Sequence, residues 1–510
     1  MKRIIASLAV LFILPSAYCQ DATDALRYSY MTGQGGTARN QSLGGAGVSL
    51  GGEFTNLFIN PAGLGYFKTG DIVISPAYRY NSNESKYLTN MATAQSSKMT
   101  IGTSGILFSN PRNYGKIRSV TVGLGVNRLA DFNNEIAYRG VNTLSSYSEK
   151  FLEELINNQV TDPNKAAQDY PFGTSMAFNT YLVDTVLDSN GDLIGYRSLA
   201  NPAFGLAQSM SVQTTGRMTE ASVGIGVNLS DKWYFGGSIG IPFLKYNRES
   251  RYKEEDDGNH ISYFNYFTAS ETLNTEGVGI NAKLGIIFQP IDKVRFGFAF
   301  HSPTYFQLTD NYNMTIVTDL EGYEGHGELQ QSSRDLNDGY MLRSRYNFSN
   351  PLRAILGGTY FLGIGPDLSQ QKGFITADVE YVNYAQAGFH DAQGSQDYKD
   401  YYKQLKEVIK SQYGSSVNLR LGGELKFNTF MVRLGGAYYG DPYLNEDAHT
   451  LRLTGGIGYR NKGFFIDLSY SHASQKDVAY PYLLQDKPNH AAVLDNTGEY
   501  IGITFGFKYF

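Results

Sequence analysis

Alternation of apolar with polar or small residues is the feature that most constrains this 510-residue chain. Residues 221–228 read ASVGIGVN, and residues 464–471 read FFIDLSYS. A period of two with apolar side chains on one side only indicates half-buried β-strands. We count about fourteen such segments, at 71–81, 98–109, 118–130, 207–229, 232–249, 264–289, 292–312, 340–362, 372–391, 416–427, 430–439, 450–460, 463–473 and 499–510.

The connections between these segments alternate in length. Tight turns are expected at 228–231, 289–292, 427–429 and 461–463, and long connections at about 82–97, 131–206, 250–263, 313–339, 392–415, 440–449 and 474–498. Transmembrane barrels of the bacterial outer membrane alternate short periplasmic turns with long external loops. The pattern therefore predicts an all-β fold, an antiparallel transmembrane β-barrel of about 14 strands spanning residues 71–510. Both termini would be periplasmic and the long loops extracellular.

The final segment contains a predicted signal for assembly into the outer membrane. Phe505, Phe507 and Tyr509 share the apolar face of the last strand, and the chain ends on Phe510, one residue out of phase. An aromatic carboxyl terminus is what the barrel-assembly machinery of the outer membrane recognises, so we predict these four residues to be the assembly signal. Because a membrane barrel can leave no free edge, the last strand should pair with the first.

The amino terminus predicts export. Lys2 and Arg3 precede the apolar run 4–14, which is too short to cross a bilayer as a helix. We predict a signal peptide at 1–19, cleaved after Cys19. Lipidation of Cys19 is the alternative, but bulky Tyr18 precedes it. After this cut the chain has no cysteine, which argues against disulfides and thiolate metal sites; we expect no cofactor and no metal.

Composition fits a membrane wall. The chain has 39 Tyr, 30 Phe and 56 Gly, and only 18% of its residues are charged. Tyrosine suits a membrane interface, where its ring meets lipid and its hydroxyl meets water. The formal net charge of −5 argues against a nucleic-acid partner. The expected surroundings are the outer membrane and its lipopolysaccharide, with the protein a monomer.

Residues 20–70 do not alternate and are rich in glycine. A short helix is expected within 21–30. Glycine lets a backbone pack closely against a wall, and an Asn-Pro pair favours a capped turn. We predict that this segment folds back as a plug, or hatch, inside the lumen. The residues expected to carry gating are Gly44, Gly45, Gly47, Asn60, Pro61 and Ala62.

Several of these motifs resemble the FadL/TodX family of outer-membrane transporters of hydrophobic compounds, as a Bacteroidetes-type member. The resemblance lies in 43–48 (LGGAGV), 60–62 (NPA), 350–354 (NPLRA), 377–381 (ADVEY), 419–424 (LRLGGE), 432–438 (VRLGGAY), 441–443 (DPY) and 451–459 (LRLTGGIGY), and covers most of the mature chain. It implies fourteen strands, an amino-terminal hatch, capture of a hydrophobic ligand outside, and sideways release into the membrane.

Charged residues on the polar side of the later strands form a second candidate site: Arg353, Asp378, Glu380, Arg420, Glu424, Arg433 and Asp467. A network of paired charges that stiffens the lumen and anchors the hatch is one interpretation. Contact with a ligand's carboxylate is the other. Two loop segments, 146–159 and 396–412, carry helical periodicity and would either bind a ligand or cap the barrel.

The motifs that match enzyme or calcium-site signatures lack the context that each signature requires. Residues 236–240 match G-x-S-x-G, but the strand pattern continues through them instead of turning into a helix. Residues 188–192 lack the glutamate that closes a calcium loop, so a turn is expected. Residues 254–257 (EEDD) suggest a solvated loop tip. We therefore predict a non-enzyme, and the resemblance implies passive entry of long-chain fatty acids or aromatic hydrocarbons. A role in protein secretion or cargo attachment, or as a haemin-binding receptor, is the alternative.

Overall fold

The structure is a computed structural model that describes residues 20–509 except 34, 259, 262, 364–371 and 445–447. The predicted signal peptide and the terminal Phe510 lie outside the described residues. Within the described part, no helix is both long enough and apolar enough to cross a membrane.

The chain folds into a closed antiparallel β-barrel of fourteen strands, as the alternation predicts. Short irregular stretches divide several strands into two elements. In chain order the wall consists of β1 (Gly70–Ile74) with β2 (Pro76–Tyr87), β3 (Asn90–Ile101) with β4 (Ser104–Pro111), β5 (Ile117–Asp131) with β6 (Asn134–Asn142), β9 (Leu206–Leu229), β10 (Trp233–Asp256), β11 (Tyr266–Ile291), β12 (Val294–His301) with β13 (Tyr305–Asp319), β15 (Leu342–Ser349) with β16 (Arg353–Leu362), β17 (Gly373–Asn383) with β18 (Gly388–Asp391), β19 (Ser415–Phe427), β20 (Phe430–Tyr439), β21 (Thr450–Asn461), β22 (Phe464–Ala479) and β23 (Ala492–Tyr509).

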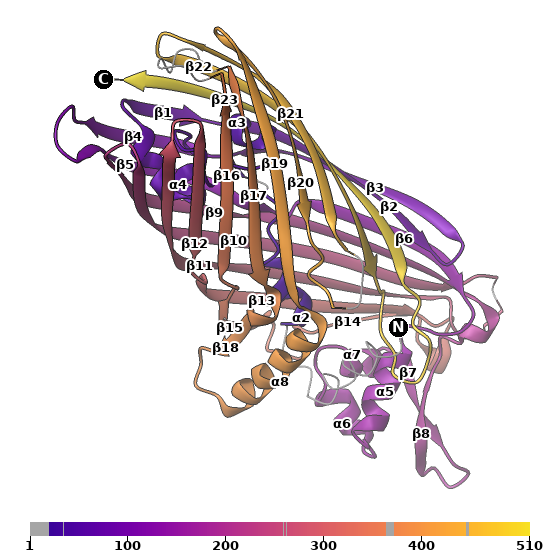
Figure 1. Cartoon of the computed structure of the whole chain (residues 1–510). Helices are drawn as coiled ribbons and strands as arrows, with labels where there is room; N and C mark the ends of the chain where they lie inside the picture. The colour runs from indigo at the N-terminus through magenta and orange to yellow at the C-terminus, as the bar shows by residue number, and fades with distance from the viewer. Residues whose placement is uncertain are drawn as a thin grey trace.

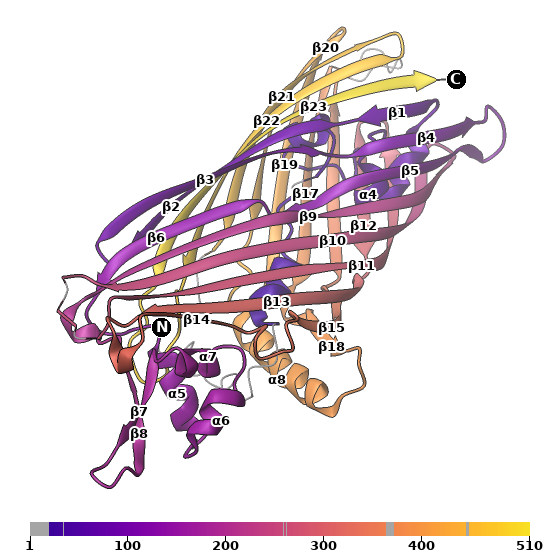
Figure 2. The ribbon, with the colours of Figure 1, turned by 180° about the vertical axis from the view of Figure 1, so that it is seen from behind.

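The last strand closes the barrel on the first. β23 pairs antiparallel with β1, where Gly70 lies opposite Tyr509, and then with β2 as far as the pair Tyr87 and Ala492. The predicted pairing of first and last strands is therefore confirmed. Figures 1 and 2 show the tight turns and the carboxyl terminus at one end of the barrel, and the loop helices at the other.

The two faces of the wall differ as a membrane requires. Outward-facing Ile225, Ile239 and Phe243 are exposed, whereas inward-facing Glu220 and Thr504 are fully buried. An apolar outside and a polar inside are the signature of a barrel wall between lipid and a lumen.

The long connections at the loop end contain further elements. These are α5 (Glu149–Asn157), α6 (Pro163–Gln168), α7 (Thr174–Asn179), the hairpin of β7 (Val183–Leu187) and β8 (Leu193–Ser198), η3 (Pro202–Phe204), η4 (Tyr323–Gly325), β14 (Glu328–Ser332), η6 (Tyr384–Gln386) and α8 (Gln396–Gln412). Both predicted loop helices are thus confirmed, as α5 and α8.

Two expectations at the loop end are wrong. The connection predicted at 82–97 is a hairpin in which only residues 88 and 89 separate β2 from β3. Residues 81–86 of β2 are polar on both faces, so the apolar alternation stops while the backbone pairing continues. Residues 254–256 belong to β10, and Glu254 is completely buried where it accepts hydrogen bonds from Tyr147 N and Gln208 Nε2. A carboxylate with several donors can be buried at the base of a loop.

Residues 20–69, here called the N-terminal segment, contain α2 (Ala22–Arg27), α3 (Ala38–Ser42), α4 (Asn56–Ile59) and the 3₁₀ helix η2 (Pro61–Tyr66). The helix expected within 21–30 is confirmed as α2. Figure 1 shows α3 and α4 enclosed by the strands near the tight-turn end, with α2 nearer the loops. Most of the segment is buried, and its backbone donates to the inward-facing side chains of Asp378, Thr454 and Thr504, so it lies against the inner face of the wall.

Candidate functional site: the interior of the barrel

Backbone groups of the N-terminal segment are held by inward-facing side chains. Asp378 on β17 accepts hydrogen bonds from Gly47 N at 2.7 Å and Val48 N at 3.1 Å. Asn60 is fully buried, caps η2 by accepting from Ala62 N, and donates from Nδ2 to Val48 O at 2.6 Å. The predicted capped turn at Asn60-Pro61 is confirmed. Such contacts satisfy an irregular backbone that is shielded from water.

Glycine allows the closest approach between segment and wall. Gly44 has φ +68°, a left-handed conformation, and a Cβ there would lie 2.5 Å from the carbonyl oxygen of Gly436 on β20. Gly45 also has positive φ, but a Cβ there would have room at 3.5 Å from Arg420. Gly47 has an ordinary φ and its nearest neighbour would be 3.4 Å away. Of the three predicted glycines, Gly44 is therefore the most constrained.

The seven predicted lumen charges separate into two groups and one lone carboxylate. In the first group Glu380 pairs with Arg420 at 2.5 Å and with Arg353 at 3.7 Å. In the second, Arg433 pairs with Glu424 and with Asp467, each at 2.6 Å. Asp378 binds the backbone of the N-terminal segment instead. The structure thus brings six of the seven into ion pairs, as a paired network requires.

Several interior residues were not predicted from the sequence. Arg39 of α3 pairs with Glu424 at 3.0 Å, and Lys283 pairs with Glu220 at 2.5 Å. His301 Nε2 lies 2.7 Å from Ile59 O. Glu220 and Lys283 do occupy polar positions of alternating strands, so the signal used for the later strands would have found them. Arg39 lies outside any alternating segment and carried no such signal.

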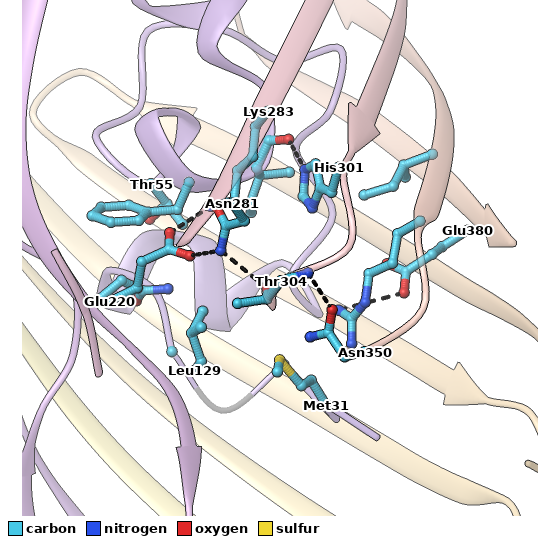
Figure 3. Close-up of a pocket in the computed structure, with 18 of the residues that line it drawn as sticks. Met31, Thr55, Leu129, Glu220, Asn281, Lys283, His301, Thr304, Asn350 and Glu380 are labelled. Carbon is cyan, nitrogen blue, oxygen red and sulfur yellow. Dashed lines mark hydrogen bonds and ion pairs between the residues drawn. The ribbon is translucent and has the colours of Figure 1, made fainter. Parts of the chain in front are cut away.

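A cavity of about 130 Å³ lies between the N-terminal segment and the wall. Its lining is mixed: Met31, Phe58, Leu129 and Ile355 are apolar, whereas Glu220, Lys283 and Glu380 are charged. Figure 3 shows Asn281 between Glu220 and Thr304, to which its Nδ2 donates at 2.8 Å and 3.2 Å. A dry cavity of about 150 Å³ accommodates benzene, so this space fits one small ring or a short stretch of alkyl chain.

A packed cluster of aromatic side chains surrounds α2 inside the barrel, and we call it the aromatic chamber. Tyr28 is fully buried and packs edge-on against Phe132, Tyr246 and Phe348 at centroid distances of 6.4, 6.3 and 5.7 Å. Other residues of the same apolar cluster include Phe306, Tyr346, Phe389, Tyr401, Tyr402 and Ile409. Gln20 fastens the start of the segment there, since its Nε2 donates to Asp310 at 2.7 Å and its Oε1 accepts from Tyr402 at 3.0 Å.

The hydrogen-bonded wall is interrupted beside β3. β4 pairs with β5 from Ser104 to Pro111, but no register joins β3 to β5 or β6 within the described strands. β6 instead lies beside β2 and β3, where Asn81 Nδ2 donates to Asn133 O at 2.8 Å and Ser96 Oγ to the same oxygen at 3.4 Å. We call this interruption the β3–β6 break. A strand edge without a partner is unusual in a membrane barrel, where backbone groups exposed to lipid are costly.

These features define the class: a transmembrane β-barrel of the outer-membrane type with a filled interior and an interrupted wall. No protein-family model matches the chain, and no curated protein sequence matches it. Among solved structures, a Pseudomonas aeruginosa FadL homologue is similar in fold, with a TM-score of 0.55 at 12% identity, covering 94% of this chain and 100% of that one.

A Pseudomonas putida toluene transporter, TodX, gives a TM-score of 0.51 at 13% identity, covering 94% of this chain and 99% of its own. At these identities the likeness is one of fold. The resemblance found in the motifs is therefore supported at the level of the FadL/TodX fold, and the Bacteroidetes type stays a prediction. Within the described residues, no cluster of His, Cys, Asp and Glu is arranged to hold a metal ion.

Proposed function

We propose that this chain is an outer-membrane channel for passive uptake of hydrophobic small molecules. The observation that carries the proposal is the aromatic chamber inside the barrel, placed next to the β3–β6 break. Lipopolysaccharide resists apolar solutes, so a protein must carry them past it. An apolar ligand gains by leaving water for such a chamber and can then leave for lipid, so no energy source is needed.

In this proposal the route runs from the loops through the chamber and out sideways at the break. Phe132 lies at the junction of β5 and β6 and also packs against Tyr28, so the chamber and the break share a residue. Release into the membrane would spare the ligand any passage through the polar contacts around Asp378 and Arg433. This arrangement supports lateral release as the exit.

The N-terminal segment would act as the hatch. A cavity of about 130 Å³ is smaller than the roughly 300–1,000 Å³ of a typical ligand pocket. A single ring fits without rearrangement, but a long acyl chain requires α2 to move out of the chamber. The fold shared with a toluene transporter supports a hydrophobic ligand. The predicted partners, termini orientation and monomeric state are part of the same proposal.

The test is uptake by cells whose outer membrane lacks its own transporters. Labelled oleate and labelled toluene are supplied to cells that express this chain and to cells that carry an empty vector. Faster entry of either compound supports the proposal. If neither enters faster than with the empty vector, in cells shown to contain the folded barrel, the channel function is wrong.

A further inference from the structure

Gln20, at the start of the N-terminal segment, is buried inside the barrel and is 1% exposed. Its side-chain amide donates to Asp310 of β13 at 2.7 Å and accepts from Tyr402 of α8 at 3.0 Å. Its backbone oxygen accepts from the hydroxyl of Tyr401. Figures 1 and 2 show α2, which follows Gln20, beside α8 at the loop end. Gln20 therefore joins the wall of the barrel to a loop helix.

The predicted cleavage after Cys19 would make Gln20 the first residue of the mature chain. A free α-amino group is protonated at neutral pH. In this position the resulting charge would lie among the side chains of the aromatic chamber. A charge that has left water is costly unless it is paired and hydrogen-bonded. The burial of Gln20 therefore raises the question of how the charge of a new amino terminus is removed or compensated.

Asp310 is the carboxylate that contacts Gln20, but both of its oxygens already have donors. Oδ1 accepts from Thr275 Oγ1 at 2.6 Å and from Tyr346 OH at 3.1 Å, and Oδ2 accepts from the Gln20 amide. The contacts of Gln20 described above use one N–H donor, one amide oxygen and one backbone oxygen. None of these contacts requires a positive charge on Gln20.

We infer that Gln20 is a modification site, at which the amino-terminal glutamine cyclises to a pyroglutamyl residue. The α-amino nitrogen attacks the carbon of the side-chain amide, and the new C–N bond closes a lactam. The old C–N bond breaks, and its nitrogen leaves as ammonia with the proton that the amine gives up. The two reacting groups belong to one residue, so their proximity favours the reaction, and no other reactant is consumed.

Cyclisation belongs to the exported chain before it folds, because the folded barrel holds the amide of Gln20 against Asp310 and Tyr402. The product fits the same position. Its lactam N–H can donate to Asp310, its lactam oxygen can accept from Tyr402, and its backbone oxygen can accept from Tyr401. The product is also neutral, so no charge enters the aromatic chamber. Lipidation of Cys19 does not fit, since lipid chains attached one residue before Gln20 would start inside the barrel.

This inference goes beyond the proposed channel function and rests on the predicted cleavage site. Mass spectrometry of the wild-type amino-terminal peptide tests it. The protein is extracted from outer membranes, denatured, and treated at once with a reagent that acetylates free amines. Trypsin then releases residues 20–27, since Arg27 is the first cleavage point after Gln20. The expected peptide carries no acetyl group and is lighter than the unmodified sequence by one ammonia, about 17 Da.

Two measurements guard against a false result. Lysines of the same digest must be acetylated, which shows that the reagent acted before any cyclisation during digestion. Pyroglutamyl aminopeptidase should remove the first residue of the wild-type peptide and leave a peptide that begins at Asp21. An acetylated peptide that begins at Gln20 would show a free amine and overturn the inference. A different first residue, or a lipid on Cys19, would also overturn it.

Gln20→Asn is the matched variant, because asparagine keeps an amide but is one methylene too short to form the same lactam. Its amino-terminal peptide should be acetylated. An unacetylated Gln20→Asn peptide would show that the amine is blocked by another modification and would contradict the inference. The wild-type mass needs no variant, so it decides the matter even if Gln20→Asn fails to fold. A pyroglutamyl end on a barrel that does not speed uptake would refute only the proposed function.

Discussion

Single residues decide how the N-terminal segment is held. The sequence predicted which charges point inward, but it did not predict their partners. Charges such as Asp378 and Arg433 stood at polar positions of strongly alternating strands, so their inward direction could be predicted. Their partners could not, because pairing depends on which strands become neighbours and on Arg39, which lies in α3.

Replacement of Arg433 should destabilise the barrel strongly. The Arg433 side chain is fully buried between Glu424 and Asp467, so Arg433→Met leaves Asp467 with Arg460, at 3.7 Å, as its one cationic partner among the described residues. Breaking a buried pair costs about 3–5 kcal/mol. Urea unfolding of the purified protein measures the loss. Arg118→Met removes an exposed pair with Asp231 at 3.7 Å and should change the free energy of unfolding by about 1 kcal/mol or less. A similar small change for Arg433→Met would contradict a tight network.

Gly44 offers the sharpest test of the fit between segment and wall. Gly44→Ala places a methyl group 2.5 Å from Gly436 O and demands positive φ, which costs about 1–2 kcal/mol in an alanine. We expect the segment to shift and the ion conductance of single barrels in a planar bilayer to rise. Gly47→Ala, with ordinary φ and room at 3.4 Å, is the control and should conduct as wild type. Equal conductance in all three proteins would count against a plug.

At the scale of elements, strands that face lipid were predictable and their extensions were not. β9 and β22 alternate because one face meets an apolar solvent. Residues 81–86 of β2 are polar on both faces, and Asn83 and Ser85 on one of these faces are buried against β6. Only backbone hydrogen bonds therefore identify this part of the chain as strand. The loop helices α5 and α8 follow from their apolar stripes. The β3–β6 break had no sequence signal, because each strand beside it has an ordinary strand pattern and only the pairing between them is missing.

The position of α2 leads to a prediction about ligand size. Tyr28→Ala should create free space inside the aromatic chamber and bind toluene more tightly, at a stability cost of about 3–5 kcal/mol for a buried ring. Phe264→Ala is the control, because Phe264 is equally buried but belongs to a separate cluster under the loops. It should lose similar stability with toluene binding unchanged. Calorimetric titration compares the two, and identical toluene affinities would place the ligand elsewhere.

For the whole molecule, the number of strands, the closure of the barrel and the class of protein could be predicted from the sequence. They follow from the periodicity and from the high cost of unpaired strand edges in lipid. The arrangement of chamber, hatch and break was not, since it depends on packing between distant segments. The central claim is that hydrophobic ligands leave through the β3–β6 break.

Cross-linking across the break tests this claim most directly. Ser96→Cys and Asn133→Cys place thiols on its two sides, where Ser96 Oγ lies 3.4 Å from the backbone oxygen of Asn133, and the chain has a single cysteine, Cys19. A short cleavable thiol cross-linker joins the pair in cells. A matched pair, Ser211→Cys with Arg251→Cys, joins β9 to β10, which are already hydrogen-bonded there.

The measurement is the rate of toluene and oleate uptake before cross-linking, after it, and after reductive cleavage. The account predicts that closing the break lowers uptake to the empty-vector rate, that cleavage restores it, and that the β9–β10 pair changes neither rate. Uptake that continues unchanged through a fully cross-linked break would contradict lateral release.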